Sequence, residues 1–178
     1  MKYGTAAVAA SLAVAFSLVA GAPSRAADLV VTLTDPAWNG FQIPAGQQCS
    51  KFGGKGATPA MRIENIPAGA NAIIVEFNDR DYQPLSDDGG HGKIGFRIKK
   101  GAKSADLPAV PGETDDMPKG AFLEERNRAT GSYATGGYLP PCSGGGGHVY
   151  FADIKAVNKV EGEDPKVLAE TRFLLGQY

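Results

Sequence analysis

The stretch GGYLPPCSGGGGHVYFADIKA, residues 136–156, joins a loop rich in glycine and proline directly to an apolar run. The run that starts at His148 and continues to Val157 is rich in β-branched and aromatic residues, which predicts a strand. The loop before it contains Cys142 and four consecutive glycines, so it is pliable but has one residue that could be covalently fixed. Three functions fit such a loop: catalysis, the rim of a ligand site, or a disulfide-fixed turn.

Further strand-like segments lie on the N-terminal side of this stretch. The β-branched run at the end of Ala68–Asp79 is the best candidate for a central strand that is covered on both faces. Alternation of apolar and polar residues predicts half-buried strands elsewhere. The predicted strands are Asp28–Asp35, Ala60–Ile66, Ala68–Asp79, Lys93–Ile98 and His148–Val157.

Two segments have a pattern that is more typical of helices. We predict a short helix around Lys119–Ala129, within a segment from Lys99 to Gly136 that is otherwise expected to be irregular. An aspartate followed by proline predicts the start of a second helix over Asp164–Tyr178, and a terminal strand at RFLL, residues 172–175, is the alternative. With 24 glycines and 12 prolines, the chain is expected to be mainly β, an antiparallel β-sandwich with one or two short accessory helices.

The first 26 residues have the pattern of a signal peptide. Lys2 supplies a basic start, AAVAASLAVAFSLVA at residues 6–20 is apolar, and Ser24 and Ala26 are the small residues of a cleavage site. A membrane anchor is the alternative, but the apolar run is shorter than the roughly 20 residues that cross a bilayer. We therefore expect residues 1–26 to be removed and residues 27–178 to form a single domain that is periplasmic or secreted.

Charge and cysteine content narrow the class further. The chain has 18 basic and 19 acidic residues, which is unlike a nucleic-acid-binding protein. No second apolar segment is long enough to cross a membrane, so the mature chain is expected to lack one. Cys49 and Cys142 are the only cysteines, and an even count in an oxidising compartment favours one disulfide. Two free thiols or a soft-metal pair are the alternatives, although no C-x-x-C and no histidine at ligand spacing accompanies them.

Paired aspartates and the only two histidines lie at the ends of predicted strands. Asp79 and Asp81 follow the central strand, and His91 lies just before the next one. His148 and Tyr150 begin the later strand, where residues two apart share a face. The simpler interpretation is that the aspartates form turns and the histidines are structural.

Known catalytic and metal motifs are absent from the sequence. It has no Walker A loop, no G-x-S-x-G elbow and no H-E-x-x-H pair. The spacing of the histidines and aspartates matches no metal signature. We therefore expect no metal, no cofactor and no catalytic residue.

Two stretches resemble the phosphatidylethanolamine-binding protein (PEBP) family, in particular its bacterial exported branch. PPCSGGGGHVYFADIKA is similar to the family's Gly-Pro-Cys-Pro-Pro-x-Gly-x-His-x-Tyr-x-Phe stretch. FQIPAGQQCSKFGGKGATPAMRIENIPAGANAIIVEFNDRDY resembles a Cys/Gly-rich loop followed by a strand that ends in Asp-Pro-Asp-Ala-Pro. The resemblance runs from about Phe41 to Val157.

The resemblance implies an antiparallel β-sandwich with a small anion-binding cavity near a C-terminal helix. Such a cavity binds phosphate-like groups, including the head group of phosphatidylethanolamine. In exported members the two cysteines lie at the positions of Cys49 and Cys142, which supports their pairing. The residues that match the family's ligand site are Asp79, Asp81, His91, Pro141, His148 and Tyr150.

This chain departs from the family pattern in two places. Arg80 and Tyr82 replace the smaller proline and alanine of the Asp-Pro-Asp-Ala-Pro core. His91 is followed by Gly92 instead of an aromatic residue, which could widen or flatten the cavity. Glycines beside His148 would let backbone N–H groups approach a ligand closely.

These observations predict an exported protein that binds a small anion, such as phosphate or phosphoethanolamine, without catalysis. The first alternative is an interaction module that inhibits a protease or kinase-like partner through residues 101–136. The second is a hydrolase that uses His148, His91 and an aspartate.

Overall fold

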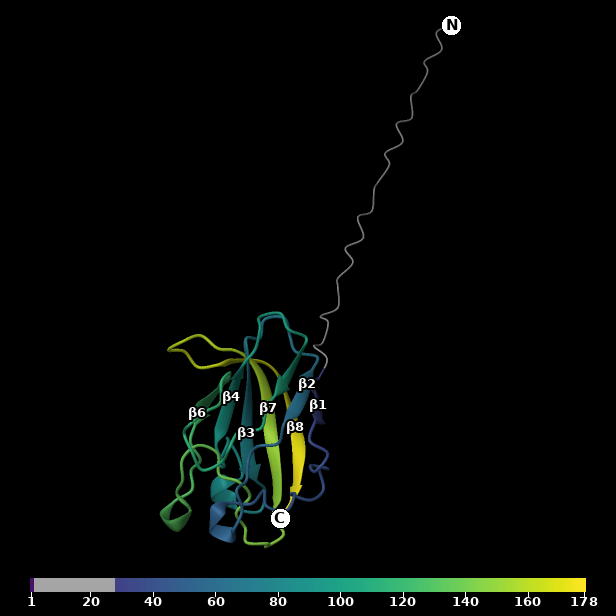
Figure 1. Ribbon diagram of the computed structural model, residues 1–178. Helices are drawn as coiled ribbons and strands as arrows, with labels where there is room; N and C mark the ends of the chain where they lie inside the picture. The colour runs from purple at the N-terminus through teal and green to yellow at the C-terminus, as the bar shows by residue number, and fades with distance from the viewer. Residues whose placement is uncertain (2–27) are drawn as a thin grey trace.

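The computed structural model of the chain describes Met1 and residues 28–178. The expected signal peptide falls, apart from Met1, outside the described residues. Strands β1 to β8 form two antiparallel sheets (Figure 1). One sheet has the order β1-β2-β5 and the other the order β6-β4-β3-β7-β8. The strands are β1 Val30–Leu33, β2 Met61–Glu64, β3 Ala72–Asp79, β4 Lys93–Arg97, β5 Ser104–Leu107, β6 Ala121–Glu125, β7 Val149–Asn158 and β8 Lys166–Gln177.

The two sheets pack face to face around one apolar core. Met61 and Ile63 of β2 pack against Ile73, Val75 and Phe77 of β3, and all five are buried. This arrangement confirms the predicted antiparallel β-sandwich. Within residues 28–178 the helical segments are three 3₁₀ turns of three residues each, η1 Ser50–Phe52, η2 Gln83–Leu85 and η3 Gly131–Tyr133.

β3 is the central strand, and every one of its residues is buried. Its alternate residues Ala72 and Ile74 form a second small cluster with Val157 on the outer face of the sheet. Phe122 of β6 covers this cluster and lies so close to Gly95 that a Cβ there would be 2.1 Å from the ring. The prediction of a strand covered on both faces is therefore confirmed.

Both predicted helices are wrong. The segment expected to be helical around residues 119–129 contains β6, which pairs with β4, and the supposedly irregular segment before it contains β5. The segment expected to be helical from residue 164 forms β8, whose pairing with β7 extends from Lys166 to Gln177. The alternative of a terminal strand at residues 172–175 was correct in type but much too short.

The burial pattern of β8 explains why the helix prediction for residues 164–178 is wrong. Glu170, Arg172 and Leu174 are exposed, whereas the alternate residues Ala169, Thr171, Phe173 and Leu175 are half-buried or buried, which is the period of two expected for a strand. Its partner β7 is a long β-branched and aromatic strand that offers a continuous row of backbone partners. This long-range pairing outweighs the local helix-start signal.

Candidate functional site

A cavity of about 420 Å³ lies at the end of the five-stranded sheet where β3 ends and β7 begins, the lower end in Figure 1. The core-facing side of β3 continues from Phe77 to Asp79, and that of β7 continues back from Tyr150 to His148. Because residues two apart share a face of a strand, both polar residues extend the core face into the cavity wall. The two strands are in register there, with Asp79 opposite Tyr150.

The structure brings the six predicted site residues to this one end of the molecule but gives them different positions. Three of them line the cavity, namely Asp79, His91 and His148. The other three, Asp81, Pro141 and Tyr150, brace its walls through hydrogen bonds described below.

The buried Asp79 pairs with the half-buried His148. His148 Nδ1 lies 2.7 Å from Asp79 Oδ2, and the Asp79 side chain is only 5% exposed. The other carboxylate oxygen of Asp79 accepts the backbone N–H of Asp81 at 2.9 Å. Asp79 is therefore fully used in orienting its neighbours, and Nε2 is the ring nitrogen of His148 that remains for a ligand.

Asp81 ties the start of β7 to the end of β3. Its Oδ2 accepts the backbone N–H of Val149 at 2.8 Å, and its carboxylate also pairs with Arg80 at 3.3 Å. The Val149 hydrogen bond is the main reason that the pKa of Asp81 is lowered, with Arg80 adding to it. Asp81 thus makes a long-range contact, whereas the local turn bond of the simpler interpretation is made by Asp79, which accepts the N–H two residues further on.

His91 is almost completely buried, with an exposed fraction of 2%. Its Nδ1 lies 2.8 Å from the carbonyl oxygen of Leu139, and its ring packs edge-on against Tyr150 at 5.4 Å between centroids. A carbonyl can only accept, so Nδ1 must donate its proton. Burial lowers the pKa of His91, and the Leu139 hydrogen bond and the Asp79 charge oppose this lowering only in part. The ring is therefore neutral at neutral pH.

The lowered pKa of His91 makes the fold sensitive to mild acid. The unfolded chain, with an ordinary histidine pKa near 6.5, binds a proton that the folded chain resists, so stability is full above this pH. As the pH falls below 6.5 toward the lower folded-state pKa, we expect the free energy of unfolding to decline by up to about 1.4 kcal/mol per pH unit. Urea titrations at pH 7.5, 6.5 and 5.5 would measure the decline.

The matched variants for this measurement are His91→Gln and His148→Gln. His91→Gln should lose the part of the decline that begins near pH 6.5, whereas His148→Gln retains His91 and should keep it. An unchanged decline in His91→Gln would show that another group causes the acid sensitivity.

Tyr150 and Pro141 hold the loop that carries Cys142. The Tyr150 hydroxyl accepts the backbone N–H of Cys142 at 3.1 Å, and the carbonyl of Pro141 accepts the backbone N–H of Cys49 at 3.0 Å. Burial raises the pKa of Tyr150 above its ordinary value, so the phenol stays neutral. Tyr150 and Pro141 therefore do not line the cavity themselves but hold the loop that does.

A disulfide joins Cys49 and Cys142, with 5.3 Å between the Cα atoms, which confirms the predicted pairing. Cys49 is fully buried beside Leu85 and Leu139, and Cys142 is part of the cavity lining. The bond therefore fixes the η1 loop to the loop that precedes β7. The glycine-rich loop of residues 143–147 starts at this fixed point.

The glycines of residues 144–147 allow the loop to adopt tight backbone conformations. Gly144, Gly145 and Gly147 have φ values of 68°, 79° and 79°, a region that other residues rarely adopt. Tyr178 closes the loop, because its carbonyl accepts both the Ser143 hydroxyl at 2.7 Å and the Gly147 N–H at 2.9 Å. The loop is thus a set of tight turns at the rim of the cavity.

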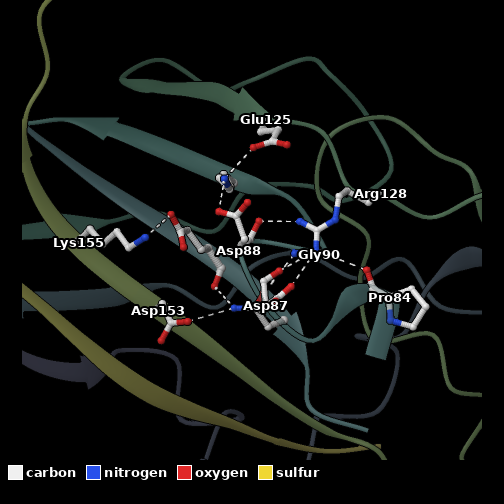
Figure 2. Close-up of polar contacts among 11 residues, drawn as sticks. Pro84, Asp87, Asp88, Gly90, Glu125, Arg128, Asp153 and Lys155 are labelled. Atoms are coloured by element: carbon white, nitrogen blue, oxygen red, sulfur yellow. Dashed lines mark hydrogen bonds and ion pairs between the residues drawn. The ribbon is translucent and has the colours of Figure 1, made fainter. Parts of the chain in front are cut away.

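Arg128 is a cavity residue that the sequence did not reveal. Its guanidinium donates to the carbonyls of Asp88 at 2.8 Å and Asp87 at 2.9 Å, and reaches that of Pro84 at 3.4 Å (Figure 2). Its backbone N–H also donates to the carbonyl of Gly90 at 2.9 Å. The guanidinium also pairs with the carboxylate of Asp87 at 3.2 Å, so one cation holds the loop of residues 84–90 against the segment that carries Arg128.

Two tyrosines add an aromatic part to the rim. Tyr82 and Tyr133 line the cavity and are 51% and 38% exposed. Tyr133 is held by Lys51, whose Nζ lies 4.2 Å from the ring centroid and donates to Ser132 at 2.8 Å. Tyr82 was visible in the sequence as a departure from the family pattern, whereas Tyr133 lay in the segment expected to be irregular or helical.

The chemistry available at the site is that of oriented hydrogen bonding. The Asp79–His148 pair could support a base, but the hydroxyl of Ser143, which lines the cavity, donates to Tyr178 and is not directed to His148. The described residues contain no group of three histidine, cysteine, aspartate or glutamate side chains that could hold a metal ion. Among the same residues, no helix is long and apolar enough to cross a bilayer.

The fold is similar to that of small β-sandwiches of the PEBP type, two of which are solved structures. The solved structure of YbcL from Escherichia coli, described as a new member of the mammalian PEBP family, is 19% identical, with a TM-score of 0.53. The likeness covers 85% of this chain and 98% of that chain.

A second neighbour is the putative PEBP homologue CT736 from Chlamydia trachomatis, which is 18% identical, with a TM-score of 0.51. It is covered to 97%, again over 85% of this chain. No family model matches the chain, and no curated protein matches it. At this identity the neighbours establish the fold, with one difference from the expectation: this chain ends in β8 where a C-terminal helix was expected.

Proposed function

We propose that the protein binds a small phosphate-bearing anion in the cavity between β3 and β7. The observation that carries the proposal is the placement of Asp79, His91, His148 and Arg128 around one cavity. A volume of about 420 Å³ lies in the range of small-molecule sites. It is large enough for a phosphate group with a short substituent.

The charges of the site fit an anion once Asp79 is accounted for. Its carboxylate already accepts hydrogen bonds from His148 and from the backbone of Asp81. When the imidazole of His148 carries both protons, Nδ1 donates to this carboxylate and Nε2 can donate to a ligand oxygen. Arg128, whose guanidinium also pairs with the exposed carboxylate of Asp87 at 3.2 Å, adds a second cationic group to the lining.

We further propose that the protein is exported and acts without catalysis. The Cys49–Cys142 disulfide is typical of oxidising compartments, and the N-terminal sequence has the pattern of a signal peptide. The residues around the cavity offer groups that bind, and the hydroxyl of Ser143 in the lining is engaged by the carbonyl of Tyr178.

The first test is calorimetric titration of the mature protein with phosphate and phosphoethanolamine, beside His148→Ala. We expect the variant to weaken binding at least tenfold, because it removes the imidazole and leaves the carboxylate of Asp79 buried without its partner. Circular dichroism would verify the fold of the variant.

Lys166→Ala is the matched control for this titration. It also removes one cation, but from the opposite end of the sheet, where Lys166 pairs with Asn158. Its affinity should equal that of the wild type. Absence of phosphate and phosphoethanolamine binding at millimolar concentration by the folded wild type would refute the proposal.

A protein-binding role is the second candidate, and the exposed tyrosines at the rim favour it. Tyr133 belongs to the segment of residues 101–136, and Tyr82 lines the same cavity. Aromatic side chains are enriched in protein interfaces. If the folded protein binds neither phosphate nor phosphoethanolamine, inhibition of a protease or kinase-like partner through this rim becomes the leading function.

A further inference from the structure

His91 carries an unused hydrogen-bond acceptor. Across residues 28–178, its Nε2 is the buried side-chain polar atom that has no hydrogen-bond partner. The other ring nitrogen must donate to Leu139, so the neutral ring has its lone pair on Nε2. His91 lines the cavity, but Nε2 itself is shielded from solvent, so a ligand must come into direct hydrogen-bond contact with the ring to use this lone pair.

An unpaired buried acceptor is costly, and a ligand that donates to it would remove the cost. The charged and titratable groups that surround His91 are Asp79, His148 and Tyr150. None of them is a hydrogen-bond partner of Nε2, because the Nδ1 of His148 is used by Asp79 and the Tyr150 hydroxyl, which accepts from Cys142, has Asp79 as a side-chain partner. The proton for His91 Nε2 is therefore best supplied by the ligand.

We infer that the cavity selects a phosphate group that carries a proton, with its P–O–H donating to His91 Nε2 and its charged oxygens facing His148. This inference rests on the proposed anion-binding function and adds a rule of specificity to it. Inorganic phosphate and phosphate monoesters can present a P–O–H. Sulfate has no such proton at neutral pH, and the diester phosphate of an intact phospholipid has none either.

Size and geometry would not separate phosphate from sulfate, since both are tetrahedral oxyanions. Only the proton differs. Sulfate would place an oxygen lone pair against the lone pair of His91 Nε2, next to the buried carboxylate of Asp79. A site with a buried polar group discriminates strongly against an analogue that leaves it unpaired.

The test is a pair of calorimetric titrations of the mature wild-type protein at pH 7, one with sodium phosphate and one with sodium sulfate. We expect phosphate to bind between about ten and a hundred times more tightly. Equal affinities would overturn the inference while leaving the anion-binding function intact. Binding of neither anion, with no binding of phosphoethanolamine, would overturn both.

His91→Gln supplies a matched variant, because its side-chain amide can donate where the histidine can only accept. We expect sulfate affinity to rise until the two anions bind within about threefold of each other. If the variant folds and still prefers phosphate by tenfold or more, His91 is not the selecting residue. If the variant does not fold, the wild-type ratio of affinities decides the matter alone.

A final arm distinguishes the source of the proton. Phosphoethanolamine is a monoester, whereas glycerophosphoethanolamine has the same ammonium group but a diester phosphate. At pH 6, near the second pKa of a phosphate monoester, about half of the monoester carries the P–O–H. We expect it to bind at least tenfold more tightly than the diester. Equal binding would assign the donated proton to the ammonium group and overturn the placement of P–O–H at His91.

Discussion

The double variant Cys49→Ala, Cys142→Ala should lose about 4–5 kcal/mol of the free energy of unfolding. The disulfide closes a loop with a sequence separation of 93 residues, and the loop entropy that it removes from the unfolded chain sets this value. Such a loss is a large part of the stability of an ordinary domain. Urea denaturation of the oxidised wild type and of the variant, followed by circular dichroism, would measure it.

The control for the disulfide is the wild type in the presence of a reductant. Reduction should lower its stability by a similar amount, whereas the double variant should be insensitive to the reductant. A loss below about 1 kcal/mol in both would mean that the unfolded chain retains structure and that loop entropy is not what the bond supplies.

Gly90→Ala should lower the free energy of unfolding by about 3 kcal/mol and weaken phosphate binding. A Cβ at Gly90 would lie 2.3 Å from the Cα of Leu85, so the backbone of the 84–90 loop must move. Leu85 and His91 both line the cavity and would move with it. Urea denaturation and phosphate titration of the variant would measure the two effects.

Gly69→Ala is the matched control, because it makes the same chemical change in another turn. The nearest atom to its Cβ is the flexible end of the Leu168 side chain at 3.2 Å, which can yield. Its stability should stay within about 0.5 kcal/mol of the wild type. If Gly90→Ala is equally mild, the contact between Gly90 and Leu85 does not define the cavity wall.

The strands were predictable where side chains alternate or are strongly β-branched. β2, β3, β4 and β7 each follow such a pattern, because a sheet that is buried on one or both faces imposes it. β5 and β6 were not predictable, since they lie at the edges of their sheets and their residues are mostly half-buried. An edge strand needs fewer apolar residues, so its sequence resembles a loop or a helix.

The residues of the candidate site were also only partly predictable from the sequence. His91 and His148 were identifiable because histidine is scarce in this chain and both lie beside predicted strands. Arg128 was not identifiable, because it donates mainly to backbone carbonyls of a loop about 40 residues earlier. Every residue has a backbone carbonyl, so residue types do not reveal such contacts. The distinct roles of Asp79 and Asp81 also required the structure, since only the fold determines which carboxylate reaches the imidazole.

The pairing of β3 with β7 has a consequence for the order of folding. β3 with β4, and β7 with β8, are hairpins that close through short segments, whereas Ala72 of β3 meets Val157 from far along the chain. Long-range pairings form slowly because a large loop must close first. Asp79 belongs to one hairpin and His148 to the other, so the two halves of the binding site meet only when the hairpins dock. We expect binding competence to appear in the last and slowest folding step.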